Sequence, residues 1–261
     1  MTITGIAAGV PFVALPPSNV DGPAPLVVTW HLMDPPRSEV AMAAAVPMSD
    51  VPAWRVYFGL PMSGRRALPG GADEFFALAA QDAVLNVFGP VTEQAADEFP
   101  AAVAALRDQL SVSDGPVGVA GGSGGSLVAY EVMARAEVPI AAGAVVSPVS
   151  QLAPVIAANA RQFEITYTWT EAARAVADRY DFVRRAAEIK VPLLIVAGAD
   201  DDIAVREPAE LAHKEIAQSE LVVIPGMGHA LADEPGLAAA PQNADARRVD
   251  AEFTRWFTKY L

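Results

Sequence analysis

Short apolar runs alternate along this chain with longer segments in which apolar residues recur at helical spacing. The apolar runs lie at residues 25–30, 52–60, 115–121, 141–147, 191–198 and 220–226. Because they are mostly continuous rather than alternating with polar residues, they predict strands buried on both faces, as in a parallel sheet. The segments with helical spacing lie at 38–46, 72–88, 92–110, 126–137, 172–189, 207–217 and 244–260. This order predicts an α/β fold, a three-layer sandwich with a mostly parallel sheet and right-handed crossovers.

Two segments depart from that rhythm. The start of the chain, MTITGIAAGVPFVAL, is interrupted by glycine and proline and has no basic residue before its apolar stretch, so it predicts a short hairpin rather than a signal peptide. Residues 149–188 make an unusually long connection between the fourth and fifth runs. Ordered insertions longer than about 12–15 residues are often lids or binding loops, so this one is expected to form a small cap, the alternative being extra helical packing at the sheet edge.

Length and composition narrow the classes of protein further. A chain of 261 residues with 52% hydrophobic content is expected to form a single domain over residues 1–261. Its mean hydropathy is +0.29, yet it lacks the uninterrupted apolar run of roughly 18 residues that a membrane span needs, so the apolar residues are assigned to a core. The absence of cysteine gives no sign of an oxidising compartment, and we expect a cytoplasmic protein.

The charge balance bears on partners. With 18 basic and 31 acidic residues the formal net charge is −13, which repels nucleic acids and anionic membranes. We expect neither as a partner, and the sequence makes no prediction of oligomeric state.

One serine stands among four glycines at the end of the third run, in VGVAGGSGGSLVAY at residues 117–130. Neither phosphate-binding pattern fits, because G-x-G-x-x-G would need a glycine at Leu127 and no Lys-Ser or Lys-Thr pair follows. The stretch Gly121–Gly125 does match G-x-S-x-G, in which a strand turns sharply into a helix and exposes a nucleophile, here Ser123. Glycines avoid collisions in such a turn. The alternative is a chance match in a chain with 19 glycines.

A nucleophilic serine needs a histidine base and a carboxylate that orients it. Of the three histidines, His213 lies in a charged helical segment, and His31 ends the first buried strand, where it is expected to shape a loop. His229 follows the last strand on a glycine-containing loop and is the expected base.

The candidate carboxylates are Asp200, Asp201 and Asp202, which follow a buried strand. Their position predicts the same carboxyl edge of the sheet as the serine. The residues alone leave the choice open, and we expect at least one of the three to be a solvated or helix-start residue.

Taken together, the serine turn and the chain order Ser, Asp, His resemble the α/β-hydrolase superfamily of serine esterases, from about Leu26 to the C-terminus. The family's acid commonly follows a strand-closing glycine by three residues, which from Gly198 implies Asp201, with Asp202 as second choice. The histidine motif is similar to the G-x-G-H form, here at residues 226–229.

The same resemblance implies an oxyanion hole. One backbone N–H would come from Gly124 and another from the loop after the first run, which reads HLMD at residues 31–34. The family commonly has His-Gly-X there, with X as the donor, so this chain has Leu32 in place of the glycine and Met33 as the implied donor. Leu32 itself is the alternative donor.

The implied activity is hydrolysis of carboxylic esters of small to medium, mostly apolar molecules through an acyl-enzyme, with no metal or organic cofactor. Serine rather than aspartate as nucleophile argues against dehalogenase and epoxide hydrolase activity. We expect substrate contacts from His31 and Leu32 in the loop and from Tyr167 and Trp169 in the cap, although these two aromatic residues are equally suited to anchoring the cap. A peptidase or amidase of the same fold is the alternative activity, and a non-catalytic binding protein is a more distant one.

Overall fold

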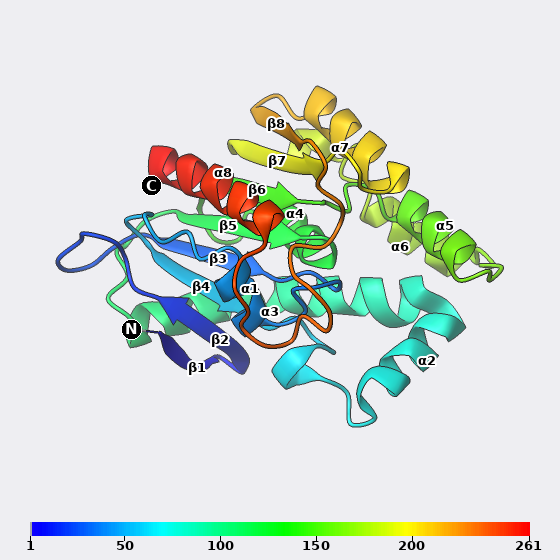
Figure 1. Cartoon of the computed structure of the whole chain (residues 1–261), viewed down its shortest axis with the longest axis horizontal. Helices are drawn as coiled ribbons and strands as arrows, with labels where there is room; N and C mark the ends of the chain where they lie inside the picture. The colour runs from blue at the N-terminus through cyan, green and yellow to red at the C-terminus, as the bar shows by residue number, and fades with distance from the viewer. Residues whose placement is uncertain (1) are drawn as a thin grey trace.

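A twisted sheet of eight strands forms the centre of the molecule (Figure 1). The structure is a computed structural model and describes residues 2–261. The strands are β1 (Ile3–Ala7), β2 (Val10–Leu15), β3 (Leu26–Trp30), β4 (Trp54–Phe58), β5 (Val117–Gly122), β6 (Ile140–Val146), β7 (Leu193–Gly198) and β8 (Ser219–Ile224). Their order across the sheet is β1-β2-β4-β3-β5-β6-β7-β8.

The pairing of the strands matches the pattern of apolar runs. Strands β3 to β8 run parallel to one another, and β3, β5 and β7 are buried throughout. The N-terminal segment forms the antiparallel hairpin β1–β2, and β2 pairs antiparallel with β4. The predictions of a mostly parallel sheet and of an N-terminal hairpin are therefore confirmed.

Helices cover both faces of the sheet, which makes the three layers. They are α1 (Glu39–Ala45), α2 (Gly71–Ala83), α3 (Gly89–Gln109), α4 (Gly124–Arg135), α5 (Leu152–Gln162), α6 (Glu171–Arg179), α7 (Ile203–Glu215) and α8 (Ala244–Tyr260). One core contains apolar residues of α1 and α8 with one face of the sheet, and a second contains those of α3, α4 and α7 with the other face. The cores fix the sheet between these helices, so the carboxyl ends of β3, β5, β7 and β8 share one edge.

Two helical predictions need correction. The segment predicted as one helix over 172–189 ends as α6 at Arg179, and after a turn it contains only a short 3₁₀ helix at Ala186–Glu188. Helix α7 begins at Ile203 rather than 207, because the Asp202 carboxylate accepts a hydrogen bond from Ala204 N and caps the helix. Asp202 is thus a helix-start residue, as expected of at least one of the three adjacent aspartates.

The stretch from Gly71 to Gln109 is nearly continuous helix, with a kink at Asp82 and a π-helix at Val84–Phe88 between α2 and α3. By length and composition alone it is a candidate membrane span, a weak criterion that buried helices of globular proteins also meet. Its α3 half packs in the core, whereas α2, which lies wholly in the described part of the chain, buries none of its 13 residues. Helix α2 lies with α5 and α6 beyond the sheet in Figure 1. The assignment of 149–188 as a cap stays a prediction.

A buried carboxylate joins α4 to the segment that follows α5. The Glu131 side chain is 2% exposed and contacts three guanidinium groups, those of Arg135 at 2.9 Å, Arg179 at 3.1 Å and Arg185 at 2.7 Å. Two of these arginines come from the connection between β6 and β7. A buried carboxylate is tolerated only when it is paired in this way, so the cluster fixes that connection to the body of the protein.

Replacement of Glu131 with Gln is expected to lower the free energy of unfolding by about 2–3 kcal/mol, because it leaves three guanidinium groups facing an uncharged buried amide. The matched control is Asp178→Asn, which breaks the exposed Asp178–Arg184 pair and is expected to cost at most about 1 kcal/mol. Urea denaturation measures both values. Equal losses in the two variants would contradict the anchoring role of Glu131.

Candidate active site

The turn between β5 and α4 holds Ser123 in a strained backbone conformation, with φ 44° and ψ −121°. Its glycine neighbours are required by close backbone contacts. A Cβ on Gly121 would lie 2.2 Å from the Gly125 carbonyl oxygen, and one on Gly125 would lie 2.4 Å from the His31 carbonyl oxygen. Gly121 and Gly125 are thus needed for the sharp turn that presents the serine at the carboxyl edge of the sheet.

The structure brings Ser123, His229 and Asp201 together from three separate loops. Ser123 Oγ lies 2.9 Å from His229 Nε2, and His229 Nδ1 lies 2.9 Å and 3.0 Å from the two carboxylate oxygens of Asp201. The Asp201 side chain is 1% exposed and that of His229 is 27% exposed. With Nδ1–H donating to Asp201, Nε2 is the nitrogen that faces the serine, which is the arrangement a general base requires.

The two aspartates adjacent to Asp201 in the chain do not contact His229. Asp202 caps α7, so it is not the partner of the histidine, and Asp200 is exposed. His213 lies 2.9 Å from Ser219 Oγ, away from this site. Across residues 2–261, no group of three or more His, Asp and Glu side chains is placed to hold a metal ion.

Gly124 and Met33 lie side by side next to the serine. A Cβ on Gly124 would come within 2.8 Å of Met33 Cγ. The N–H of Leu32 donates to the Pro36 carbonyl at 3.2 Å and so is not a free donor, whereas that of Met33 has no partner among the described residues. Gly124 is the first residue of α4, so its N–H has no acceptor within the helix. The geometry therefore favours Met33 over Leu32 as the second donor of an oxyanion hole.

The expected substrate contacts of His31 and Leu32 require correction, because both residues are fully buried. His31 Nδ1 donates to the Leu32 carbonyl at 2.6 Å, and its Nε2 accepts from Leu60 N at 3.1 Å. Burial lowers the pKa of His31 to about 4, which keeps the imidazole neutral and able to accept that bond. Leu32 packs against Gly122. Both residues shape the loop rather than face a ligand.

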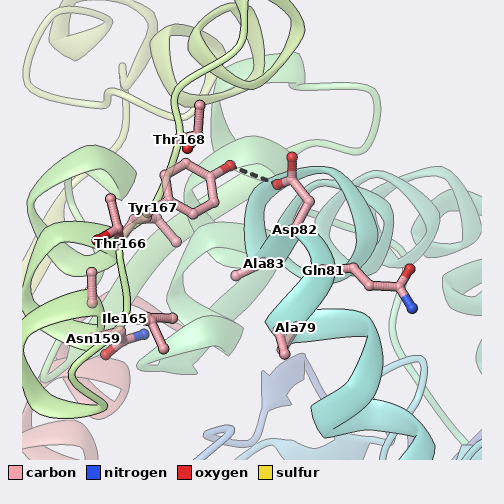
Figure 2. Close-up of a pocket in the computed structure, with 12 residues that line it drawn as sticks. Ala79, Gln81, Asp82, Ala83, Asn159, Ile165, Thr166, Tyr167 and Thr168 are labelled. Carbon is pink, nitrogen blue, oxygen red and sulfur yellow. Dashed lines mark hydrogen bonds between the residues drawn. The ribbon is translucent and has the colours of Figure 1, made fainter.

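Tyr167 and Trp169 lie beside each other, with their rings in edge-to-face contact at 4.8 Å. Figure 2 shows the Tyr167 hydroxyl pointing at Asp82, to which it donates a hydrogen bond of 2.6 Å. Together with residues of α2 and α5, Tyr167 lines a cavity of about 160 Å³. The lining of this cavity includes none of Ser123, Asp201 and His229. The structure thus joins Tyr167 to the kink of α2, and its contact with substrate stays a prediction.

A second carboxylate, which the sequence analysis missed, also touches the histidine. Asp34 Oδ2 lies 3.4 Å from His229 Nε2, on the side of the serine. Asp34 is the last residue of the HLMD motif and follows Met33 directly. A charged residue next to the expected oxyanion donor is the sequence signal by which Asp34 could have been predicted as a site residue. Burial lowers the pKa of His229, but Asp201 and Asp34 raise it more, so that it reaches about 10.

The Asp34 loop and the His229 loop are bonded to each other. Arg37 N donates to the Gly236 carbonyl at 2.7 Å, and Leu231 N donates to the Pro35 carbonyl at 2.9 Å. These bonds hold the donor loop and the histidine in one arrangement.

Comparison with known proteins adds the family. The prolyl oligopeptidase family matches residues 90–261, which include the serine, the aspartate and the histidine described above. This chain belongs to the prolyl oligopeptidase family. Its fold is the α/β-hydrolase fold that the sequence motifs predicted.

A curated relative matches about half of this chain. An uncharacterized protein of Mycobacterium tuberculosis is 32% identical over 128 residues, which are 48% of this chain and 41% of that protein. This chain thus spans about two fifths of the length of the curated relatives that it matches.

Solved structures share the fold at lower identity. TT1662 from Thermus thermophilus has a TM-score of 0.66 and 18% identity, and the match covers 98% of both chains. Est1E from Butyrivibrio proteoclasticus has a TM-score of 0.63 and 16% identity over 99% of this chain and 98% of that one. A puromycin-hydrolyzing peptidase of Mycobacterium tuberculosis has a TM-score of 0.68 and 16% identity, over 100% of this chain and 39% of that one.

Gly125→Ala is expected to lower the free energy of unfolding by at least about 2 kcal/mol, because the new Cβ collides with backbone rather than with a movable side chain. The control is Gly115→Ala, where a Cβ meets nothing within 4 Å. Thermal or urea unfolding compares the two. An unchanged stability in Gly125→Ala would contradict the close packing of the turn.

The pKa of His229 is expected to lie above its ordinary value of 6.5, because the carboxylates of Asp201 and Asp34 stabilise the imidazolium by more than burial destabilises it. NMR titration of the histidine rings measures it, and the small number of histidines makes assignment by His229→Ala practical. Asp201→Asn should move the titration toward the ordinary value of 6.5. A parent titration near 6.5 would show that the two carboxylates do not act as described.

Proposed function

We propose that this chain hydrolyses carboxylic esters of small to medium, mostly apolar molecules through an acyl-enzyme on Ser123. The observation that carries the proposal is the unbroken hydrogen-bonded chain from Ser123 through His229 to Asp201, with the N–H groups of Gly124 and Met33 beside it. A nucleophile, a base, an orienting carboxylate and oxyanion donors are the complete set that acyl transfer requires.

In the first half of the reaction, Ser123 Oγ attacks the ester carbonyl carbon while His229 Nε2 takes the hydroxyl proton. Asp201 stabilises the resulting imidazolium through Nδ1, and the N–H groups of Gly124 and Met33 bind the oxyanion. The tetrahedral intermediate then breaks its bond to the leaving oxygen. That oxygen receives its proton from His229 Nε2, and the acyl group stays on Ser123.

In the second half, water attacks the acyl-enzyme carbonyl carbon and gives a proton to His229 Nε2. The same N–H groups bind the second oxyanion. Collapse of this intermediate breaks the bond to Ser123 Oγ, which recovers its proton from His229, and the carboxylic acid leaves. The cycle consumes one water for each ester.

The surroundings of the donors support a mostly apolar substrate. The Met33 side chain lies against Gly124, so an apolar group borders the place where the carbonyl oxygen would bind. Ser123 is buried apart from 6% of its surface, which restricts access to the nucleophile. An acyl group of modest size and low polarity fits these surroundings best.

Cleavage of amide or peptide bonds is the second candidate, and membership of the prolyl oligopeptidase family favours it. Some structural neighbours are named as peptidases, among them an acylaminoacyl peptidase of Pyrococcus horikoshii. The match covers 41% of that peptidase's chain. The same residues would act in the same order, with His229 protonating the leaving amine. Comparison of an ester and an anilide that share one acyl group distinguishes the candidates by their kcat/KM.

Ser123→Ala is expected to lower kcat for p-nitrophenyl esters by about 10⁴-fold or more and to abolish labelling by a fluorophosphonate probe, because both reactions need the activated hydroxyl. The chain-length series from acetate upward, measured on the parent, gives the size of the acyl site. The control is Ser113→Ala, at the opposite end of β5, which should behave like the parent. Turnover by Ser123→Ala at the parent rate would overturn the mechanism.

A further inference from the structure

Asp34 occupies the substrate side of the histidine. Its Oδ2 lies 3.4 Å from His229 Nε2, the same nitrogen that lies 2.9 Å from Ser123 Oγ. Its side chain is 52% exposed, in contrast to that of Asp201, which is 1% exposed. Asp201 is therefore sealed behind the imidazole, whereas Asp34 is open to whatever binds at the serine.

This placement hinders the reaction of a neutral ester in two ways. A carboxylate at Nε2 favours the imidazolium, and a protonated Nε2 cannot take the proton of Ser123. The charge also follows directly after Met33, whose N–H would bind the oxyanion, so it opposes the negative charge that develops there. Hence a neutral ester should react more slowly at this site than an ester that offsets the charge of Asp34.

The described residues provide only partial compensation. The charged groups that face His229 are Asp201 and Asp34, both acidic. Arg37 acts on Asp34 from a distance, but its guanidinium Nη2 is bonded to Glu234 Oε1 at 2.8 Å. Within residues 2–261 the carboxylate of Asp34 has one ion-pair contact, the one with His229. A cationic group on the substrate side would complete the charge balance.

We propose that Asp34 is a specificity-determining residue that binds an ammonium group in the leaving alcohol of the ester and thereby frees His229 to act as base. The inference rests on the proposed ester hydrolysis. His229 Nε2 must reach the leaving oxygen to protonate it, so the leaving group lies next to that nitrogen, and Asp34 lies there too. The test therefore places the cation two carbons beyond the ester oxygen, on the leaving-group side that Asp34 shares.

Pairing of the substrate's ammonium group with Asp34 would reduce both the protonation of His229 Nε2 and the repulsion of the oxyanion. An ammonium group beside Asp34 offsets its negative charge, which lowers the preference of Nε2 for the imidazolium and removes the repulsion of the oxyanion. A neutral alcohol of the same shape gains neither effect. Because the reaction transfers the same acyl group in both cases, the discrimination resides in the leaving group alone.

The test compares two butanoate esters of the same shape, the 2-(trimethylammonio)ethyl ester and the uncharged 3,3-dimethylbutyl ester. For the parent, kcat/KM of the charged ester should exceed that of the neutral one by about tenfold or more, as expected for a partly exposed charge pair. In Asp34→Asn the ratio should fall to about one. Asp34→Ala, which also removes the side-chain contact with the histidine, should give the same ratio.

A second measurement separates this role from a merely structural one. In Asp34→Asn the pH at which kcat/KM for the neutral ester rises should shift downward, because one of the two carboxylates that stabilise the imidazolium is gone. The neutral ester should therefore be hydrolysed faster than by the parent near pH 7, a gain that misfolding cannot produce. The control is Asp233→Asn, an equal change of charge at an exposed residue of the His229 loop, which should keep the parent ratio and pH profile.

The inference falls if Asp34→Asn keeps the parent ratio or the parent pH profile. If in that case the parent still hydrolyses the neutral ester with Ser123 dependence, the proposed function stands without it. If the parent hydrolyses neither ester and a fluorophosphonate does not label Ser123, both proposals fall together.

Discussion

The close approach of backbone to backbone around Ser123 is the constraint on which the rest of the site depends. The turn leaves no room for a Cβ at Gly121 or at Gly125, where carbonyl oxygens of the turn and of β3's following loop stand in the way. This crowding brings the end of β5, the start of α4 and the loop after β3 into direct contact. Nucleophile and oxyanion donors are therefore placed by one packing arrangement, with little freedom to move apart.

Hydrogen bonds between two loops extend that arrangement to the base. The loop after β3 carries Met33 and Asp34, and the loop after β8 carries His229, and backbone bonds through Pro35 and Arg37 join them. The buried His31 fixes the first loop from behind through its bonds to Leu32 and Leu60. Residues far apart in the chain thus form one rigid edge above the sheet, which is what a preorganised catalytic site needs.

The electrostatics of this edge of the sheet depend on the imidazole of His229, which lies between the carboxylates of Asp201 and Asp34. Asp201, sealed from solvent, orients His229 and supports its charged form during the reaction. Asp34 supports the same charged form from the open side, where it acts before the reaction starts. The two aspartates differ in the nitrogen that they face, since Asp201 contacts Nδ1 and Asp34 contacts Nε2, the nitrogen beside Ser123.

The sequence by itself determined the parallel sheet, because its strands are continuous apolar runs. It also selected Ser123 and His229, because the serine stands in a glycine-rich turn and the chain holds only three histidines. It left the choice among adjacent aspartates to a resemblance, and only the helix cap at Asp202 and the bond from His229 resolved it in the structure. It misjudged His31 and Leu32, since burial depends on packing against distant residues. It also missed Asp34 beside His229, because that contact joins two loops almost 200 residues apart, and only the tertiary structure decides such a distance.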